Sequence, residues 1–125
     1  MASCLWTDPP YNVNYIGTAT KTREVIRNDK HASAESFRTF LLAAFRCAHD
    51  HLAPGSGCYI AHADMEAVNF RTALIDAGFY FAQCLVWIKS HFVLGRQDHQ
   101  YMHEPILYGR KEGEAHRWYG GRDKT

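Results

Sequence analysis

The alternation of short apolar runs with amphipathic stretches limits the fold of this 125-residue chain more than any other feature. Four apolar runs fit buried strands, at 2–7, 58–61, 81–89 and 104–108. Strands that alternate with helices predict a parallel sheet covered by helices. The last run follows its predecessor without a helix, so we expect it to pair antiparallel. The length and the pattern predict one α/β domain.

Two segments between these runs have helical periodicity. In the first, Ser33 is the expected N-cap and apolar residues recur at three- and four-residue steps from Phe37 onwards. Pro54–Gly57 is expected to end this helix and form a tight turn. Asp64 is expected to cap the second helix, and Gly78 stands where a helix C-terminus favours glycine. The polar stretch 12–30 is predicted to be a loop.

The charge of the chain excludes a general nucleic-acid binder. With 14 basic and 13 acidic residues the net charge is +1, so any DNA contact must come from a local patch. No C-x-x-C or H-E-x-x-H pattern occurs, and no metal site is expected. No signal peptide or long apolar run is present, which predicts a cytoplasmic protein.

Several sulfur-containing and aromatic residues fall inside the predicted strands. We expect Cys4, Cys58 and Cys84 to be buried free thiols of a reducing compartment. Trp6 and Trp87 occupy similar positions and are expected in the core.

Asp8-Pro9-Pro10-Tyr11 is the motif that indicates chemistry. It follows the first predicted strand, at the sheet edge where α/β proteins bind ligands. The Asp8 carboxylate and the Pro9 carbonyl can accept hydrogen bonds from an exocyclic base amine, which favours a nitrogen with an available lone pair. Two prolines make these acceptors rigid, and Tyr11 can stack on an extruded base.

The motif and its context resemble a known family. Residues 7–13 (Thr-Asp-Pro-Pro-Tyr-Asn-Val) resemble motif IV of amino-methylating DNA methyltransferases, which act on adenine N6 or cytosine N4. Residues 52–57 resemble the segment that follows this motif. Residues 83–89, 94–98 and 103–109 resemble later motifs of prophage-type DNA methylases, so the likeness covers nearly the whole chain.

The resemblance implies a partial Rossmann-like methyltransferase sheet, mainly parallel with an antiparallel last strand and helices covering it. It implies that Asp8, Pro9, Pro10 and Tyr11 are catalytic, with Asp8 also close to the donor S-adenosylmethionine. The substrate implied is double-stranded DNA with a flipped target base. Tyr11, Arg96 and His103 would contact this DNA, and Lys89 is a further candidate for a phosphate contact.

The family's donor-binding Phe-x-Gly-x-Gly segment is not found in residues 1–125. Gly55-Ser56-Gly57 follows a helix and precedes a strand, which is the reverse of the order such a loop requires. The chain is therefore predicted to be the catalytic part of an enzyme whose motif precedes its donor-binding segment. We expect it to bind the donor weakly alone, and to form a homodimer or pair with a complementary segment that covers the exposed sheet.

Several functional alternatives stay open at this stage. Aspartate at the first motif position favours adenine N6 by resemblance, while cytosine N4 remains an alternative because the amine chemistry is shared. A non-catalytic remnant that still folds is a second alternative. Methylation of a protein amide or an RNA base is a third. Related motifs there begin with asparagine, so Asp8 argues by resemblance against the protein-amide case.

Overall fold

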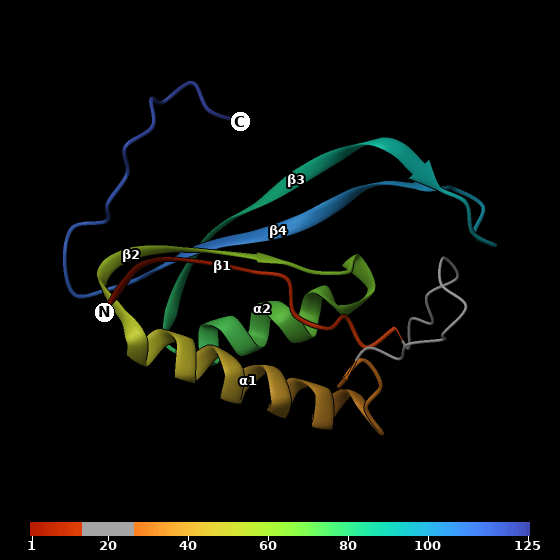
Figure 1. The fold of residues 1–125 in the computed structure, drawn as a ribbon, viewed down its shortest axis with the longest axis horizontal. Coiled ribbons are helices and arrows are strands. Elements are labelled where there is room, and N and C mark those ends of the chain that lie inside the picture. Colours follow the sequence, from red (N-terminus) through yellow and green to blue (C-terminus); the bar gives the residue numbers. More distant parts are fainter. Residues whose placement is uncertain (14–26) are drawn as a thin grey trace.

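The computed structural model describes residues 1–13 and 27–125, which form a sheet with helices packed on it. Most of the predicted loop 12–30 thus lies outside the described residues. The elements are β1 (Ala2–Thr7), α1 (Ala34–His51), β2 (Leu52–Ala61), the 3₁₀ helix η1 (Asp64–Glu66), α2 (Ala67–Asp76), β3 (Phe79–Val93) and β4 (Tyr101–Lys111), as drawn in Figure 1. No helix in these ranges is long and apolar enough to cross a membrane.

The sheet has the strand order β1-β2-β4-β3. β1 and β2 are parallel, and β4 runs antiparallel to both β2 and β3. Three strands therefore point the same way and only the last opposes them, which confirms the predicted arrangement. β3 and β4 continue beyond the other strands as a long two-stranded arm (Figure 1).

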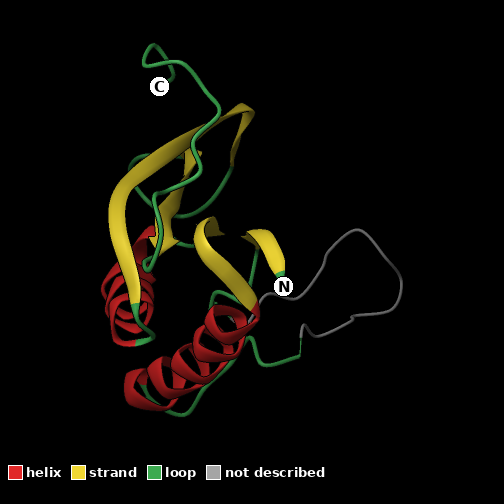
Figure 2. Ribbon diagram, turned by 90° about the vertical axis from the view of Figure 1, so that its left-hand side faces the viewer, coloured by secondary structure: helices red, strands yellow, loops and turns green. Residues whose placement is uncertain are grey.

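Both helices pack on one face of the sheet (Figures 1 and 2). α1 begins as predicted at Ser33, whose side chain accepts from the Ser36 amide in a reciprocal capping box. The apolar stripe then buries Phe37, Leu41 and Phe45. These side chains meet Phe70 and the other apolar residues of α2 and the strands. The core cluster consists of Phe37, Leu41, Phe45, Leu52, Cys58, Ile60, Phe70, Ala73, Leu74, Ala77, Phe79 and Leu107.

The predicted turn at Pro54–Gly57 is wrong, because these residues belong to β2. α1 continues to His51 and the strand begins at the next residue. Ala2 pairs with Leu52 but Cys4 pairs with Gly57, so β2 carries extra residues here as a bulge. Gly55 has φ of +79°, which glycine adopts readily. The turn-forming residues thus bend a strand instead of ending a helix.

The boundaries of α2 match the prediction at one end only. Asp64 begins η1, and its N-cap residue is Ala63, with no side-chain cap, so the predicted Asp64 cap is wrong. At the other end Gly78 has φ of +99° and its amide donates to the Ile75 carbonyl, as expected of a C-terminal glycine.

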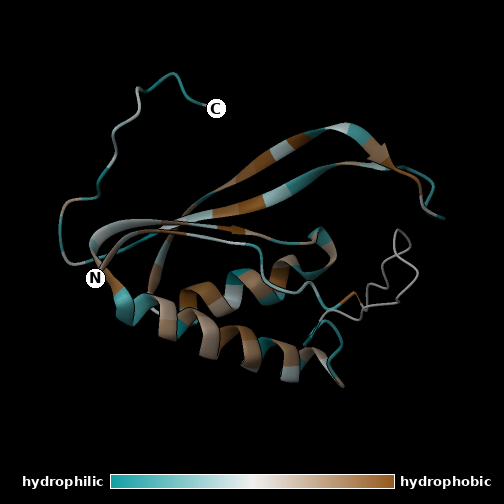
Figure 3. Cartoon of the chain, viewed as in Figure 1, coloured by the Kyte–Doolittle hydropathy of each residue, from teal (hydrophilic) through white to brown (hydrophobic). Residues whose placement is uncertain are grey.

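Among the described residues, the sheet face opposite the helices is largely uncovered and apolar, and we call it the open face. Trp6 and Trp87 are 62% and 53% exposed, so their predicted core positions are wrong. Together with Tyr59, Leu85 and Ile106 they line a shallow hollow of about 380 Å³. Figure 3 shows hydrophobic stretches along β3 and β4 as well as in the helices.

The cysteines differ in their exposure. Cys58 is buried as predicted, whereas Cys4 and Cys84 are exposed, contrary to expectation. Apolar runs predicted strands with two covered faces, but among the described residues the helices cover one face only. The C-terminal tail crosses part of the other, where the Arg117 amide donates to the Gly55 carbonyl at 3.0 Å.

Candidate functional site

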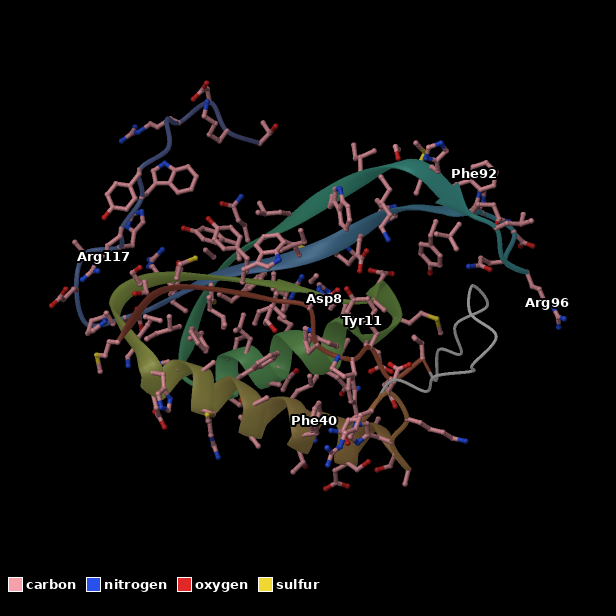
Figure 4. The ribbon with its side chains drawn as sticks, viewed as in Figure 1. Asp8, Tyr11, Phe40, Phe92, Arg96 and Arg117 are labelled. Atoms are coloured by element: carbon pink, nitrogen blue, oxygen red, sulfur yellow. The ribbon has the colours of Figure 1, made fainter. Side chains whose placement is uncertain are left out.

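Asp8-Pro9-Pro10-Tyr11 leaves the carboxyl end of β1, at the edge of the sheet. Each proline fixes its own φ and removes a backbone donor, so the strand stops and the segment has little conformational freedom. Asp8 is exposed, and the two prolines and Tyr11 are partly buried. Figure 4 shows Asp8 and Tyr11 close together, beside the helices and below the arm.

Tyr11 is held at both ends of its side chain. Its hydroxyl donates a hydrogen bond to Glu104 Oε1 on β4, and its ring packs edge-on against Phe70 with centroids 6.3 Å apart. Burial, followed by the carboxylates of Asp8 and Glu104, raises the pKa of the phenol far above its ordinary value. Tyr11 therefore remains a neutral hydrogen-bond donor.

Glu104 lies between Tyr11 and a cation. Lys89 Nζ on β3 is 2.6 Å from Glu104 Oε2, and the Glu104 side chain is only 14% exposed. Burial by itself would raise the pKa of this carboxyl, but the hydrogen bonds from Lys89 and Tyr11 outweigh burial and lower it. Glu104 is thus an ionised acceptor of both groups at neutral pH.

A cleft of about 530 Å³ lies against these side chains, and we call it the base cleft. Its walls come from the β1 end, the β2–η1 junction and the arm: Tyr11, Val13, His62, Ala63, Asp64, Met65, Lys89, Val93, Gln97, Tyr101, His103, Glu104 and Pro105. The volume lies in the range of pockets that hold small organic ligands. Its walls combine aromatic rings with a few polar groups.

His62 is the buried polar residue of this cleft. It is 1% exposed, its ring stacks on Phe70 at 5.2 Å, and within the described part of the chain its Nδ1 has no hydrogen-bond partner. Burial lowers the pKa of the imidazole below its ordinary 6.5. His62 is therefore neutral at physiological pH.

This lowered pKa predicts a loss of stability in mild acid. The unfolded chain takes up the His62 proton first, so the stabilisation is complete above about pH 6.5 and is lost as the pH falls towards the folded pKa. Urea unfolding at about pH 7 and about pH 5.5 should show a smaller decrease for His62→Gln than for the wild type. His99→Gln, in the exposed loop between β3 and β4, is the control. Equal decreases in the wild type and His62→Gln would contradict the assignment.

The structure brings most of the sequence-predicted site residues together. Tyr11 and His103 line the base cleft, and Asp8, Pro9 and Pro10 precede Tyr11 directly. Arg96 does not join them, because it lies at the tip of the arm (Figure 4). Lys89 is paired with Glu104 and is not a free surface cation.

Sequence reasoning missed Glu104 and His62. Glu104 lies inside the stretch 103–109, where the apolar pattern predicts only a strand, and His62 follows an apolar run with no pattern around it. A charged residue within an otherwise apolar strand was the available signal, since such a residue is seldom buried without a partner.

Comparisons with known proteins concern the family and the fold of this chain. Residues 2–122 match a family model described as DNA methylase, whose name specifies N6 and N4 methyltransferases. No curated protein matches the sequence significantly. Among solved structures, the complex of M1.HpyAVI with SAM has a TM-score of 0.58 at 15% identity, covering 88% of this chain and 44% of that one.

A second solved structure is similar over nearly the whole chain. TTHA0409 of Thermus thermophilus, described as a candidate DNA modification methylase, has in its complex with S-adenosyl-L-methionine a TM-score of 0.56 at 22% identity. The match covers 98% of this chain and 50% of that one. At these identities the similarity establishes the fold. The chain spans about half the length of these solved structures.

Proposed function

The chain belongs to the N6 and N4 DNA methylase family, and from this membership we propose that it is the catalytic part of a DNA methyltransferase. In this proposal, the enzyme transfers a methyl group from S-adenosylmethionine to the exocyclic amine of a DNA base, with adenine N6 preferred. The main supporting observation is the rigid segment Asp8–Tyr11, which ends at the wall of the base cleft. A cytoplasmic location is part of this proposal.

The residues of this segment have different roles in preparing the base amine for methylation. Tyr11 stacks on the extruded base, a contact worth roughly 1–3 kcal/mol. The Asp8 carboxylate and the Pro9 carbonyl accept hydrogen bonds from the two amino hydrogens, which localises the lone pair on nitrogen. S-adenosylmethionine supplies an electrophilic methyl group on a sulfonium sulfur. With the donor bound in the completed domain, Asp8 would hold the amine in position and would be the acceptor for the proton that the amine loses on methylation.

The choice between adenine and cytosine rests on the first residue of the motif. Aspartate at position 8 favours adenine by family resemblance, and cytosine N4 methylation is the alternative. A non-catalytic remnant of such an enzyme is the alternative that the experiment below distinguishes from an active one.

The open face and the outer edge of β1 support the proposal that a complementary segment completes the domain. β1 is a terminal strand of the sheet, and the face with Trp6 and Trp87 presents large apolar side chains to solvent. Because this chain spans about half of the similar solved structures, the proposed partner is the donor-binding segment of the same methyltransferase domain. Burial of two tryptophans would supply a large apolar area.

A donor titration tests the proposed function. Calorimetry with S-adenosylmethionine should detect little binding to residues 1–125 alone, and micromolar binding, about 8 kcal/mol, once a donor-binding segment is added. Sedimentation shows in parallel whether two copies associate instead. Methylation of DNA by the completed domain would support the enzyme. A completed domain that binds donor but never methylates DNA would favour the remnant.

Substitution of Arg96 tests whether the arm contacts DNA. In this proposal Arg96 contacts a phosphate, since it stands exposed at the arm tip (Figure 4). Arg96→Ala should weaken DNA binding uniformly across sequences and lower the salt slope of the affinity by about 1. Arg46→Ala, exposed on α1, is the matched control. An unchanged salt slope in Arg96→Ala would remove this contact from the proposal.

A further inference from the structure

Glu104 joins two parts of the chain that are 93 residues apart in sequence. One carboxylate oxygen accepts from the Tyr11 hydroxyl, and the other lies 2.6 Å from Lys89 Nζ. The link therefore runs from the segment after β1, through β4, to β3. Both ends of the link, Tyr11 and Lys89, also line the base cleft.

The strand register explains why these groups meet. Glu104 on β4 pairs directly with Trp87 on β3, in an antiparallel ladder. Lys89 is two residues beyond Trp87, so it projects from the same face and reaches the carboxylate diagonally. The Lys89 ammonium also lies 5.2 Å from the centre of the Trp87 ring. The cation is thus held by neighbours on its own strand and on the next.

The contacts fix the Tyr11 ring before any ligand arrives. Phe70 meets the ring edge-on, with planes at 77°, and the hydroxyl is anchored by Glu104. A free tyrosine side chain must give up rotamer freedom when a base stacks on it, which weakens binding. A ring that is already held does not incur this cost, and its position relative to Asp8 stays constant.

We propose that Glu104 is a positioning residue, which holds Tyr11 as a fixed wall of the base cleft. Lys89 neutralises the negative charge of Glu104. The inference rests on the proposed function, in which Tyr11 stacks on the target base. Glu104 acts through Tyr11 and touches no reacting atom. The amide oxygen of Glu104→Gln can accept the Tyr11 hydrogen bond, and the partly exposed Lys89 can turn to solvent, away from the amide nitrogen. Glu104→Gln should therefore preserve the function and Glu104→Ala should lose it.

A first experiment observes Tyr11 directly and requires no ligand. The protein is labelled with fluorotyrosine, and Tyr11→Phe identifies the Tyr11 signal among the seven tyrosines in the fluorine NMR spectrum. Glu104→Ala should move this signal alone, while Glu104→Gln and the control Glu112→Ala, exposed after β4, should leave it near its wild-type position. An unmoved signal in Glu104→Ala would overturn the proposal. A change in all the signals would indicate a general loosening and would overturn it as well.

A second experiment measures base binding, with a labelled single-stranded oligonucleotide of adenines as the probe. Glu104→Ala should weaken the affinity about 3- to 10-fold, Glu104→Gln should stay near the wild type, and Glu104→Ala combined with Tyr11→Phe should be no weaker than either alone. If Tyr11→Ala weakens binding while Glu104→Ala does not, the proposal is wrong. A wild type that binds no oligonucleotide would contradict the proposed function, and the fluorine signal would still decide whether Glu104 holds Tyr11.

Discussion

Replacing Asp8 with alanine is expected to lower the rate of methyl transfer by about 100- to 1000-fold, in the domain completed by its donor-binding segment. This is the usual cost of removing one preorganised hydrogen-bonding group that acts on the reacting atoms. Asp8 is exposed, so the thermal unfolding of the variant should match that of the wild type. Transfer of a labelled methyl group to DNA measures the rate.

Two further variants make the Asp8 result specific. Asp8→Asn retains one acceptor oxygen and should keep part of the activity that Asp8→Ala loses. Asp50→Ala, at an aspartate exposed on α1, should leave the rate unchanged. An Asp8→Ala enzyme that works within about threefold of the wild type would exclude Asp8 as the group that orients the amine.

Replacing Phe70 with alanine is expected to have the largest effect on stability, a loss of about 3–5 kcal/mol. Phe70 is fully buried and its ring meets those of Phe37, Phe45, His62 and Tyr11, at 5.7, 6.2, 5.2 and 6.3 Å between centroids. The substitution opens a cavity among these rings, which the surrounding helices and strands can only partly close. Urea unfolding measures the loss.

The control for Phe70 is a phenylalanine outside the core. Phe92 lies on the arm and is 58% exposed (Figure 4), so Phe92→Ala should change the free energy of unfolding by less than about 1 kcal/mol. Phe70→Leu should cost less than Phe70→Ala because it leaves a smaller cavity. A loss below about 1 kcal/mol for Phe70→Ala would mean that the ring does not support the core.

The elements of the fold that depend on residues close together in the sequence were predictable. The stripe from Phe37 to Phe45 and the cap at Ser33 identified α1, because both depend on neighbours three or four residues away. The antiparallel last strand followed from the lack of a helix before it. Asp8–Tyr11 was predicted as a site because the motif carries its own geometry, with two prolines and a strand end.

The features that depend on distant parts of the chain were not predictable. Trp6 and Trp87 are apolar residues in strands, and only the arrangement of the helices on one face shows that they are exposed. The bulge at Gly55 follows from the register between β1 and β2. Glu104 meets Tyr11 across most of the sequence, so no short window contains both partners.

The position of β4 between β2 and β3 also limits the order in which the strands can pair during folding. While the chain is being synthesised, β1 and β2 can pair with each other as soon as both have emerged, but β3 has no neighbour in the sheet until β4 follows. The apolar strand Phe79–Val93 therefore has no strand partner until β4 has been synthesised, because β4 is its neighbour in the sheet and also pairs with β2. The same late step builds the Glu104 wall of the base cleft, so the binding site is completed together with the sheet and not before it.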